Sequence, residues 1–277
     1  MLNLILAMTF SMMISVVMRV SEKYTKSEVA MLAANYLACA VMGVIFTGTD
    51  LFPAVDGLKT TLGLGVFNGA LFLGSFMLLK WNVSKNGVVL PATFMRLGVL
   101  VPTFLSIFAF GEKPGALQII GIIAALFAIV LMQGKNSGGK AASIGGFILL
   151  LIGGGCADSM SKVYEMYGSA ALKDHFLIYT FAVALILCII ICIVRRQKPG
   201  LAELGFGLLL GIPNYLSTRF LLMSLADVPA VIAYPTYSAG TIVMVTIVGM
   251  VFFKEKLGKR KLISLAIILA ALVLLNL

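Results

Sequence analysis

The chain has 277 residues, of which 61% are hydrophobic and 12% are charged, whereas an average soluble domain is about 45–50% apolar and about 25% charged. This composition excludes a water-soluble domain and indicates an integral membrane protein. Lysine and arginine outnumber aspartate and glutamate by 21 to 11, but there is no soluble basic domain that could bind nucleic acid. We therefore expect the basic excess to set the orientation of the chain in a membrane.

Apolar runs recur from end to end, each long enough to cross a hydrocarbon layer of about 30 Å, or roughly 20 residues. Polar residues, glycines and prolines divide these runs, which predicts an all-α polytopic membrane protein with ten transmembrane helices. The predicted spans are 2–20, 28–47, 58–79, 87–110, 115–133, 143–163, 174–194, 201–223, 229–252 and 259–277. The four cysteines lie inside these runs, so we expect small core residues rather than disulfides or a metal site, and no cofactor.

Basic residues are divided unevenly between the two sides of the predicted membrane. Odd-numbered loops carry fifteen of them, beginning with Arg19, and even-numbered loops carry three, Lys59, Lys113 and Lys173. Basic loops are retained in the cytoplasm, so the odd-numbered loops are predicted to be cytoplasmic. Both termini are then predicted to lie on the outer side of the cell membrane. No basic residue precedes the first span, the reverse of a secretory signal, so we expect that span to remain as a helix.

The two halves of the chain resemble each other at an offset of 143–144 residues. The offset aligns Glu22 with Glu165, Tyr36 with Tyr179, Phe76 with Phe220, Pro91 with Pro235, and Glu112 with Glu255. Because each half has an odd number of spans, the second would enter the membrane upside down. The pattern predicts two inverted five-helix repeats, 1–139 and 140–277, within one integral membrane domain, as in many secondary transporters. The alternative is a chance alignment of apolar helices with similar composition.

Each half also closes in the same way, with "FGEKPG" at residues 110–115 and "FKEKLG" at 253–258 before an apolar helix. In these turns and in its two five-helix units, the chain resembles the ten-helix EamA-like branch of the drug/metabolite transporter superfamily. The resemblance implies a helical bundle that moves small metabolites, often amino acids or related compounds, by alternating access. It also implies cytoplasmic termini, whereas the loop charges predict the opposite.

Three ionisable residues lie well inside predicted spans, where each costs about 2.5–3.5 kcal/mol on insertion scales: Arg96, Asp158 and Arg219. Arg96 is a candidate ligand for a carboxylate or phosphate, because a guanidinium holds such anions through two parallel hydrogen bonds. The alternative is a structural arginine tied to backbone carbonyls or to a carboxylate such as Asp158. Asp158 is also a candidate coupling or gating group. Arg219 is either a gating group or an arginine that extends to the membrane surface.

Polar and aromatic residues beside prolines complete the candidate substrate site. Tyr234, Tyr237 and Ser238 share one helical face next to Pro235. The third and eighth spans add further candidates, Asn68, Asn214 and Tyr215. Tyrosine rings can pack on an apolar ligand and donate one hydrogen bond, although ordinary core tyrosines would show the same pattern.

Other polar positions have simpler interpretations. We expect Arg19 and Glu22, and likewise Lys162 and Glu165, to form ion pairs one helical turn apart. His175, the single histidine, is expected to be a solvated residue at the start of a helix, with a pH-sensing gate as the alternative.

These observations predict a secondary transporter rather than an enzyme or a channel. The sequence has no HExxH, GxSxG or GxxxxGK[ST] motif and no repeated filter loop. The leading hypothesis is a carrier for a small carboxylate-bearing metabolite, with Arg96 binding its anionic end. The alternatives are a carrier of lipophilic cations or drugs that pair with Asp158, and a lipid flippase. Expected partners are the small-molecule substrate, membrane lipids and, as a candidate coupling ion, the proton, with the chain acting as a monomer or homodimer.

Overall fold

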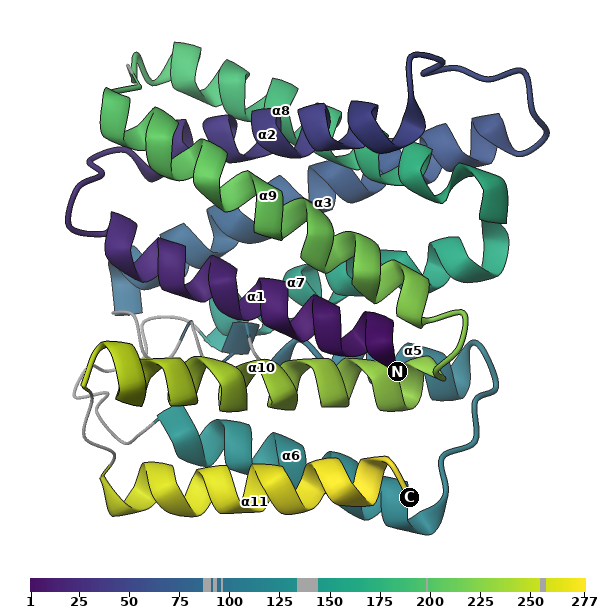
Figure 1. Ribbon diagram of the computed structural model, residues 1–277, viewed down its shortest axis with the longest axis vertical. Helices are drawn as coiled ribbons and strands as arrows, with labels where there is room; N and C mark the ends of the chain where they lie inside the picture. Colours follow the sequence, from purple (N-terminus) through teal and green to yellow (C-terminus); the bar gives the residue numbers. More distant parts are fainter. Residues whose placement is uncertain (87–90, 92–93, 96, 134–143, 198, 255–257) are drawn as a thin grey trace. The chain divides into compact units, whose positions relative to one another are not determined.

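The computed structural model describes residues 1–277 except 87–90, 92–93, 96, 134–143, 198 and 255–257. Within the described residues the chain is all helical, with ten α-helices and one 3₁₀ turn (Figure 1). The elements are α1 (Leu2–Ser21), α2 (Glu28–Thr47), α3 (Leu58–Asn86), α5 (Leu100–Phe108), α6 (Ala116–Gln133), α7 (Ile144–Tyr167), η1 (Ala170–Leu172), α8 (Lys173–Val194), α9 (Leu201–Ser224), α10 (Ala230–Phe252) and α11 (Lys259–Leu275).

The helices agree closely with most of the predicted spans. The bounds of α2 coincide with the prediction, and those of α8 and α9 differ from it by one residue at one end. Seven helices in the described part of the chain are long and apolar enough to cross a membrane. The apolar stretch of α6 and the helix α11 are shorter, and part of the fourth predicted span lies outside the described residues. The polytopic class is therefore confirmed, whereas the count of ten spans stays a prediction.

The chain folds into two compact units, and each unit takes helices from both halves of the sequence. Unit I comprises Leu2–Leu73 and Met160–Ser224, and unit II comprises Gly74–Ser159 and Leu225–Leu277 together with Met1. The helices α3 and α7 each contribute to both units. Neither unit coincides with a half of the chain, so the two predicted repeats contribute to both units. Their structural equivalence stays a prediction.

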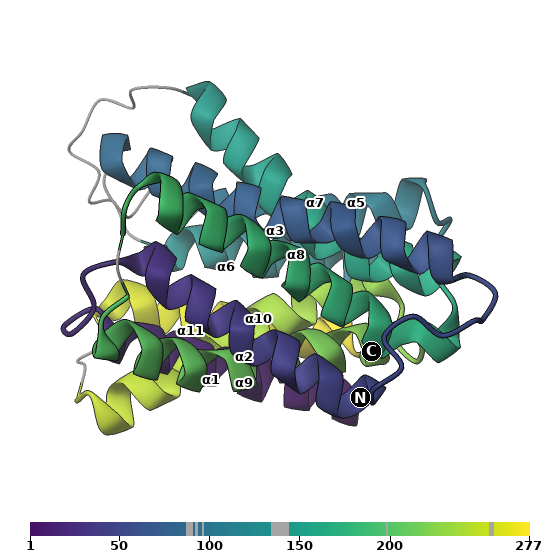
Figure 2. The same ribbon diagram turned by 90° about the horizontal axis from the view of Figure 1, so that it is seen from above.

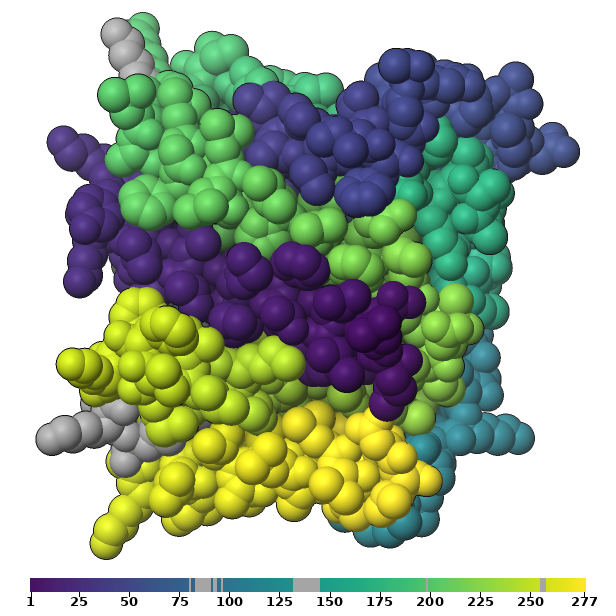
Figure 3. Space-filling model, in the orientation of Figure 1, coloured from purple at the N-terminus to yellow at the C-terminus, as the bar shows by residue number. Residues whose placement is uncertain are grey.

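In unit I, pairs of glycines four residues apart bring helices into close contact. A Cβ atom on Gly211 of α9 would lie 2.5 Å from the Ala38 Cβ of α2, and α9 lies between α1 and α2 (Figure 3). On α3, a Cβ on Gly65 would lie 2.7 Å from the Tyr179 Cβ, and one on Gly69 would lie 2.8 Å from the Val183 Cβ. Seen from above, α3 runs along α8 (Figure 2). Such small residues let helix backbones approach closely in a membrane, where no hydrophobic effect drives association.

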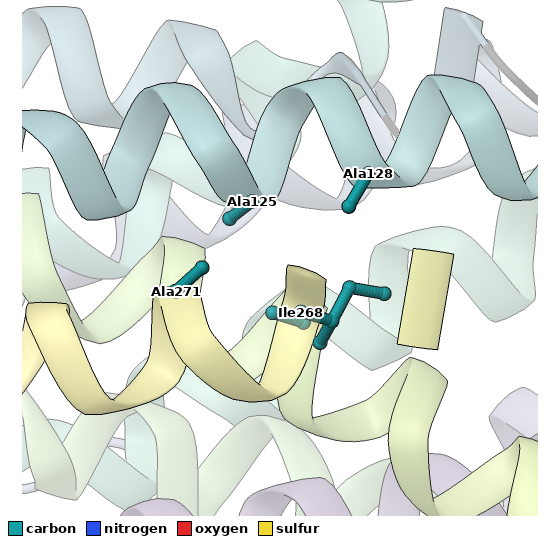
Figure 4. Packing of buried hydrophobic residues seen from close by; sticks show 5 residues of the cluster. Ala125, Ala128, Ile268 and Ala271 are labelled. Carbon is teal, nitrogen blue, oxygen red and sulfur yellow. The ribbon is translucent and has the colours of Figure 1, made fainter. Parts of the chain in front are cut away.

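In unit II, small side chains join α6 to α11. Ala125 and Ala128 of α6 face Ile268 and Ala271 of α11, and all four are 0–1% exposed (Figure 4). Ala239 of α10 completes this cluster. The two helices run side by side along most of their length (Figure 1). The predicted fifth and tenth spans therefore form one packed layer with α10.

Gly211 and Gly205 give a matched test of the close contact between α9 and α2, because they lie on the same helix. We expect Gly211→Ala to lower the free energy of unfolding by about 1–3 kcal/mol, since the added methyl group overpacks the contact. A Cβ on Gly205 meets nothing within 4 Å, so Gly205→Ala should stabilise the helix by up to about 1 kcal/mol. Melting temperatures of the purified protein would check both, and equal melting temperatures for the two variants would contradict the proposed contact.

Candidate functional site

Arg219 forms a two-point ion pair with Asp174 in unit I. Its Nε donates to Asp174 Oδ1 at 2.6 Å, and its Nη2 donates to Asp174 Oδ2 at 3.1 Å. The guanidinium carbon lies 4.2 Å from the centre of the Phe46 ring, a cation–π contact. The side chains of Arg219 and Asp174 are 19% and 26% exposed. The arginine is therefore held in place between α8, α9 and α2.

Tyr215 connects this ion pair to the interior of unit I. It is fully buried, its hydroxyl lies 3.5 Å from Asp174 Oδ1, and its ring stacks on Phe46 at a centroid distance of 5.6 Å. Arg219 and Tyr215 were both candidates from the sequence, and the structure brings them together around one carboxylate. Asp174 was not among the candidates.

A cavity of about 170 Å³ lies beside the ion pair. Its lining residues are Ala170, Lys173, Asp174, Leu177, Arg219, Leu222 and Met223. Two of these residues carry a positive charge and one carries a negative charge, so the cavity is positive overall. A small anionic group is the complementary ligand.

Buried amides cross the middle of unit I. Asn214 Nδ2 on α9 donates to Asn35 Oδ1 on α2 at 3.2 Å, and Asn68 Nδ2 on α3 donates to Thr180 Oγ1 on α8 at 3.3 Å. Asn35 and Asn68 are each 1% exposed. Among the described residues, Asn35 Nδ2 and Asn68 Oδ1 have no hydrogen-bond partner. A buried polar atom left unsatisfied costs about 1–3 kcal/mol, so these two atoms are suited to bind a polar ligand or water.

The loop between α2 and α3 packs on the start of α8. His175 Nε2 lies 3.0 Å from the Asp50 carbonyl oxygen, and the Tyr179 hydroxyl donates to the Leu51 carbonyl oxygen. His175 is only 9% exposed. The prediction of a solvated histidine was therefore wrong, because the loop folds back over the first turn of α8 and covers the ring.

In unit II, Tyr234 of α10 contacts α7 close to Asp158. Its hydroxyl donates to the Asp158 carbonyl oxygen at 2.9 Å, and Tyr234 is 2% exposed. Ser238, one turn further on, is 8% exposed, and Tyr237 is half-buried. The Asp158 side chain itself is exposed, although its neighbours Ala157 and Ser159 are buried. Arg96 and its predicted pairing with Asp158 lie outside the described residues.

Glu112, from the "GEK" turn, caps the helix that carries these tyrosines. Its two carboxylate oxygens accept hydrogen bonds from the backbone N–H groups of Ala230 at 3.0 Å and Val231 at 2.8 Å. A carboxylate at a helix N-terminus satisfies otherwise free N–H groups and interacts favourably with the helix dipole. In the sequence, the recurrence of the "GEK" and "KEK" turns marks Glu112 as a residue of interest. It does not indicate that α10 is the helix that Glu112 caps.

The structure thus distributes the candidate residues between the two units. Arg219, Tyr215, Asn68 and Asn214 belong to unit I, whereas Asp158, Tyr234, Tyr237 and Ser238 belong to unit II. The predicted ion pair of Lys162 with Glu165 is confirmed, with a distance of 2.8 Å. Within the ranges described, no three histidine, cysteine, aspartate or glutamate residues come together as a metal site.

Comparison with known proteins identifies similar chains. Residues 145–277 match the model of the EamA-like transporter family. An uncharacterized protein of Haemophilus influenzae is 24% identical over 285 residues, covering 98% of this chain and 96% of that protein. The uncharacterized membrane protein YvaE of Bacillus subtilis is 40% identical over 61 residues, which are 22% of this chain and 51% of YvaE. A crystal structure with 13% identity superposes over 99% of this chain and 94% of its own, with a TM-score of 0.76, which shows likeness of fold alone.

We expect Asp174 and Arg219 to be energetically coupled. Asp174→Asn or Arg219→Gln alone should lower the free energy of unfolding by about 1.5–3 kcal/mol, because each leaves a partly buried charge without its hydrogen bonds. The double variant should lose less than the sum of the single losses. Lys173→Gln is the control, since it removes a charge from the same cavity without breaking the pair. Measuring the free energy of unfolding of all four variants would check this. If the loss in the double variant equals the sum of the two single losses within about 0.5 kcal/mol, the coupling is contradicted.

Proposed function

Because residues 145–277 match the model of the EamA-like transporter family, we propose that this multi-pass membrane protein is a secondary transporter. Its cargo is a small carboxylate-bearing metabolite, amino-acid-like in its chemistry, which crosses the cytoplasmic membrane by alternating access. Two inverted five-helix repeats provide the two alternating conformations. Glycines four residues apart make close helix contacts on both α3 and α9, one helix from each half, and this similarity supports the repeat.

The observation that carries this proposal is the group of polar side chains inside otherwise apolar helices of unit I. Polar and ionisable groups in membrane spans mark substrate and ion pathways, since they are costly unless a function retains them. Asn35 and Asn68 each keep a buried polar atom without a partner in the described structure. Either atom would gain a partner from a ligand that carries its own hydrogen-bonding groups. The positive cavity beside Arg219 favours an anionic group on that ligand.

The roles of the individual residues follow from their chemistry. Arg96 binds the carboxylate of the cargo, and Tyr234, Tyr237 and Ser238 of unit II contact the remainder. Within unit I, Asn68, Asn214 and Tyr215 offer hydrogen bonds to a polar ligand. Arg219 acts as a gate, because its bond to Asp174 joins α8 to α9 and can break and re-form as these helices move. Asp158 serves as the coupling group and takes up a proton. The order of these steps is set by which side of the membrane is open.

One observation favours a second candidate, a carrier of lipophilic cations. Asp158 lies within an apolar span, and its side chain is exposed while its neighbours are buried. In a membrane span, such a carboxylate faces the interior of the bundle or a water-filled cavity, or pairs with another group. A cationic cargo could then pair with Asp158, with Arg96 in a structural role.

A thermal-shift screen of the purified protein against a metabolite library tests the proposed function directly. A ligand that binds the folded state stabilises it and so raises the melting temperature. At a ligand concentration one hundred times the dissociation constant, the stabilisation is about 2.7 kcal/mol. We expect small carboxylates to stabilise the protein and lipophilic cations to have no effect. Stabilisation by cations alone would support the second candidate and overturn the first.

Variants of Arg96 distinguish an anion-binding role from a structural one. We expect Arg96→Lys to lose most transport, because an ammonium keeps the charge but cannot form two parallel hydrogen bonds, and Arg96→Ala to lose more. Uptake would be measured beside expression and melting temperature. Arg260→Lys is the control: Arg260 Nε donates to the Leu131 carbonyl oxygen at 2.8 Å, which places that arginine at a backbone contact rather than in the site.

The structural alternative makes a different prediction for the pair Arg96 and Asp158. If the two form a buried ion pair, either neutral variant costs about 3–5 kcal/mol and the double variant recovers folding. A double variant that regains both stability and transport would exclude anion binding by Arg96. A double variant that folds but does not transport would retain the site assignment.

Orientation is predicted from the loop charges, with both termini outside. In a variant without native cysteines, Lys23→Cys and Lys259→Cys should therefore resist an impermeant thiol reagent in intact cells, whereas Lys59→Cys should react. All three lysines are exposed in the structure, so burial does not explain a difference. The opposite labelling pattern would show cytoplasmic termini.

A further inference from the structure

An apolar groove of about 560 Å³ runs along α2 and α8 in unit I, and nothing in the proposed transport cycle uses it. This volume lies within the range of about 300–1,000 Å³ typical of small-molecule sites. Alanines of α2, among them Ala30 and Ala33, form one wall, and Leu185, Ile189 and Ile193 of α8 form the other. Small side chains on α2 thus leave space that the larger residues of α8 do not fill.

The groove has the length of one membrane leaflet. Its α8 wall runs from Leu185 to Ile193, which is about 12 Å of helix axis. Half of a hydrocarbon layer about 30 Å thick is similar in depth. The groove begins at the end of α8, where Arg196, Gln197 and Pro199 form its rim. A lipid chain entering from the membrane surface would lie along the groove with its head group at the rim.

Arg196 occupies a backbone position that favours glycine. Its φ is 50°, in the left-handed region where a side chain is strained. Its N–H bonds to the Ile193 carbonyl oxygen at 3.0 Å, and the Gln197 N–H bonds to the Cys192 carbonyl oxygen at 2.9 Å. These two bonds form a Schellman motif, in which glycine is usual at the position of Arg196. An arginine in a strained conformation indicates a function for its side chain.

The Arg196 side chain is available for a ligand. It is exposed, and within the described residues its guanidinium has no ion-pair or hydrogen-bond partner. The rim around it is fixed by Glu203, whose carboxylate accepts bonds from the backbone N–H of Lys26 at 2.6 Å and of Gly200 at 3.1 Å. Glu203 is 5% exposed, its carboxylate is engaged in these bonds, and among the described residues it forms no ion pair with Arg196. Arg195 is also exposed at this end of α8.

We propose that this groove binds an anionic phospholipid, with an acyl chain between α2 and α8 and the phosphate head group on Arg196. The apolar walls supply the affinity for the chain, and a guanidinium binds a phosphate through two parallel hydrogen bonds. Basic residues at the cytoplasmic ends of spans attract anionic lipids in the same way. The proposal is independent of the transported cargo.

Binding would be measured on the full-length protein in neutral phosphatidylcholine nanodiscs, with phosphatidylglycerol of matched chain length as the probe. Native mass spectrometry gives the affinity, and thermal unfolding gives the stabilisation. We expect Arg196→Gly to bind phosphatidylglycerol about tenfold more weakly, as the loss of a charge-assisted hydrogen bond implies. Its melting temperature in neutral lipid should be equal or higher, because glycine relieves the strained backbone. Loss of binding therefore cannot be attributed to misfolding.

Two further variants separate the groove from general surface charge. Arg195→Gln removes a charge one residue away that does not line the groove, so phosphatidylglycerol binding should stay unchanged. Ala33→Phe fills the groove and should weaken binding while Arg196 remains, and Ala33→Leu gives a smaller filling if the first variant is unstable in neutral lipid. Equal losses in the Arg195 and Arg196 variants, no loss in Arg196→Gly, or full binding in a folded Ala33 variant would each overturn the proposal. Inorganic phosphate alone should not stabilise the wild type, and stabilisation by it would show an ion site without a lipid.

Discussion

The close approach of helices through glycine is the constraint on which the rest of unit I depends. A Cβ on Gly211 would also crowd the Asn35 backbone, and Asn214, one turn beyond Gly211, bonds to the Asn35 side chain. On α3, a Cβ on Gly69 would lie 2.5 Å from the Thr180 carbonyl oxygen, and Asn68 bonds to the Thr180 hydroxyl. In both cases the glycine and the amide belong to the same contact. Larger residues in place of Gly211 or Gly69 would push the helices apart. The amides of Asn214 and Asn68 would then lose their partners, and burying such unsatisfied groups costs free energy.

The same contact explains why polar chemistry can be placed inside an apolar bundle. A side chain amide needs a hydrogen-bond partner at roughly 3 Å, and only backbones in close contact bring short side chains such as asparagine and threonine that near. Arg219 is different, because its long side chain reaches Asp174 and crosses the Phe46 ring. Amides in the middle of unit I are therefore fixed by backbone packing, whereas the ion pair at the end of α9 depends on two side chains and can separate with a smaller disturbance of the fold.

Helix positions were predictable because the apolar runs end at clear signals. Ser27 begins α2 by accepting a hydrogen bond from the N–H of Ala30, and Gly48 ends it with a positive φ of 78°. The pairing of Arg219 was not predictable, because its partner lies 45 residues away and looks like an ordinary acidic residue at a helix start. The cap that Glu112 provides 118 residues away has the same character. Local signals determine the elements, whereas long-range contacts between single polar residues depend on the packing and leave no pattern in one sequence.

The two ends of the helix pair α8 and α9 stabilise their charges in different ways. At one end Asp174 and Arg219 neutralise each other within the protein, and at the other end Arg196 projects from a groove without a protein partner among the described residues. A ligand shifts a conformational equilibrium only by the difference in its affinity for the two states. A lipid at Arg196 would therefore influence transport if the groove changes width between states. Because α8 carries both the groove wall and Asp174, a movement of α8 against α9 that separates Asp174 from Arg219 would also alter the groove.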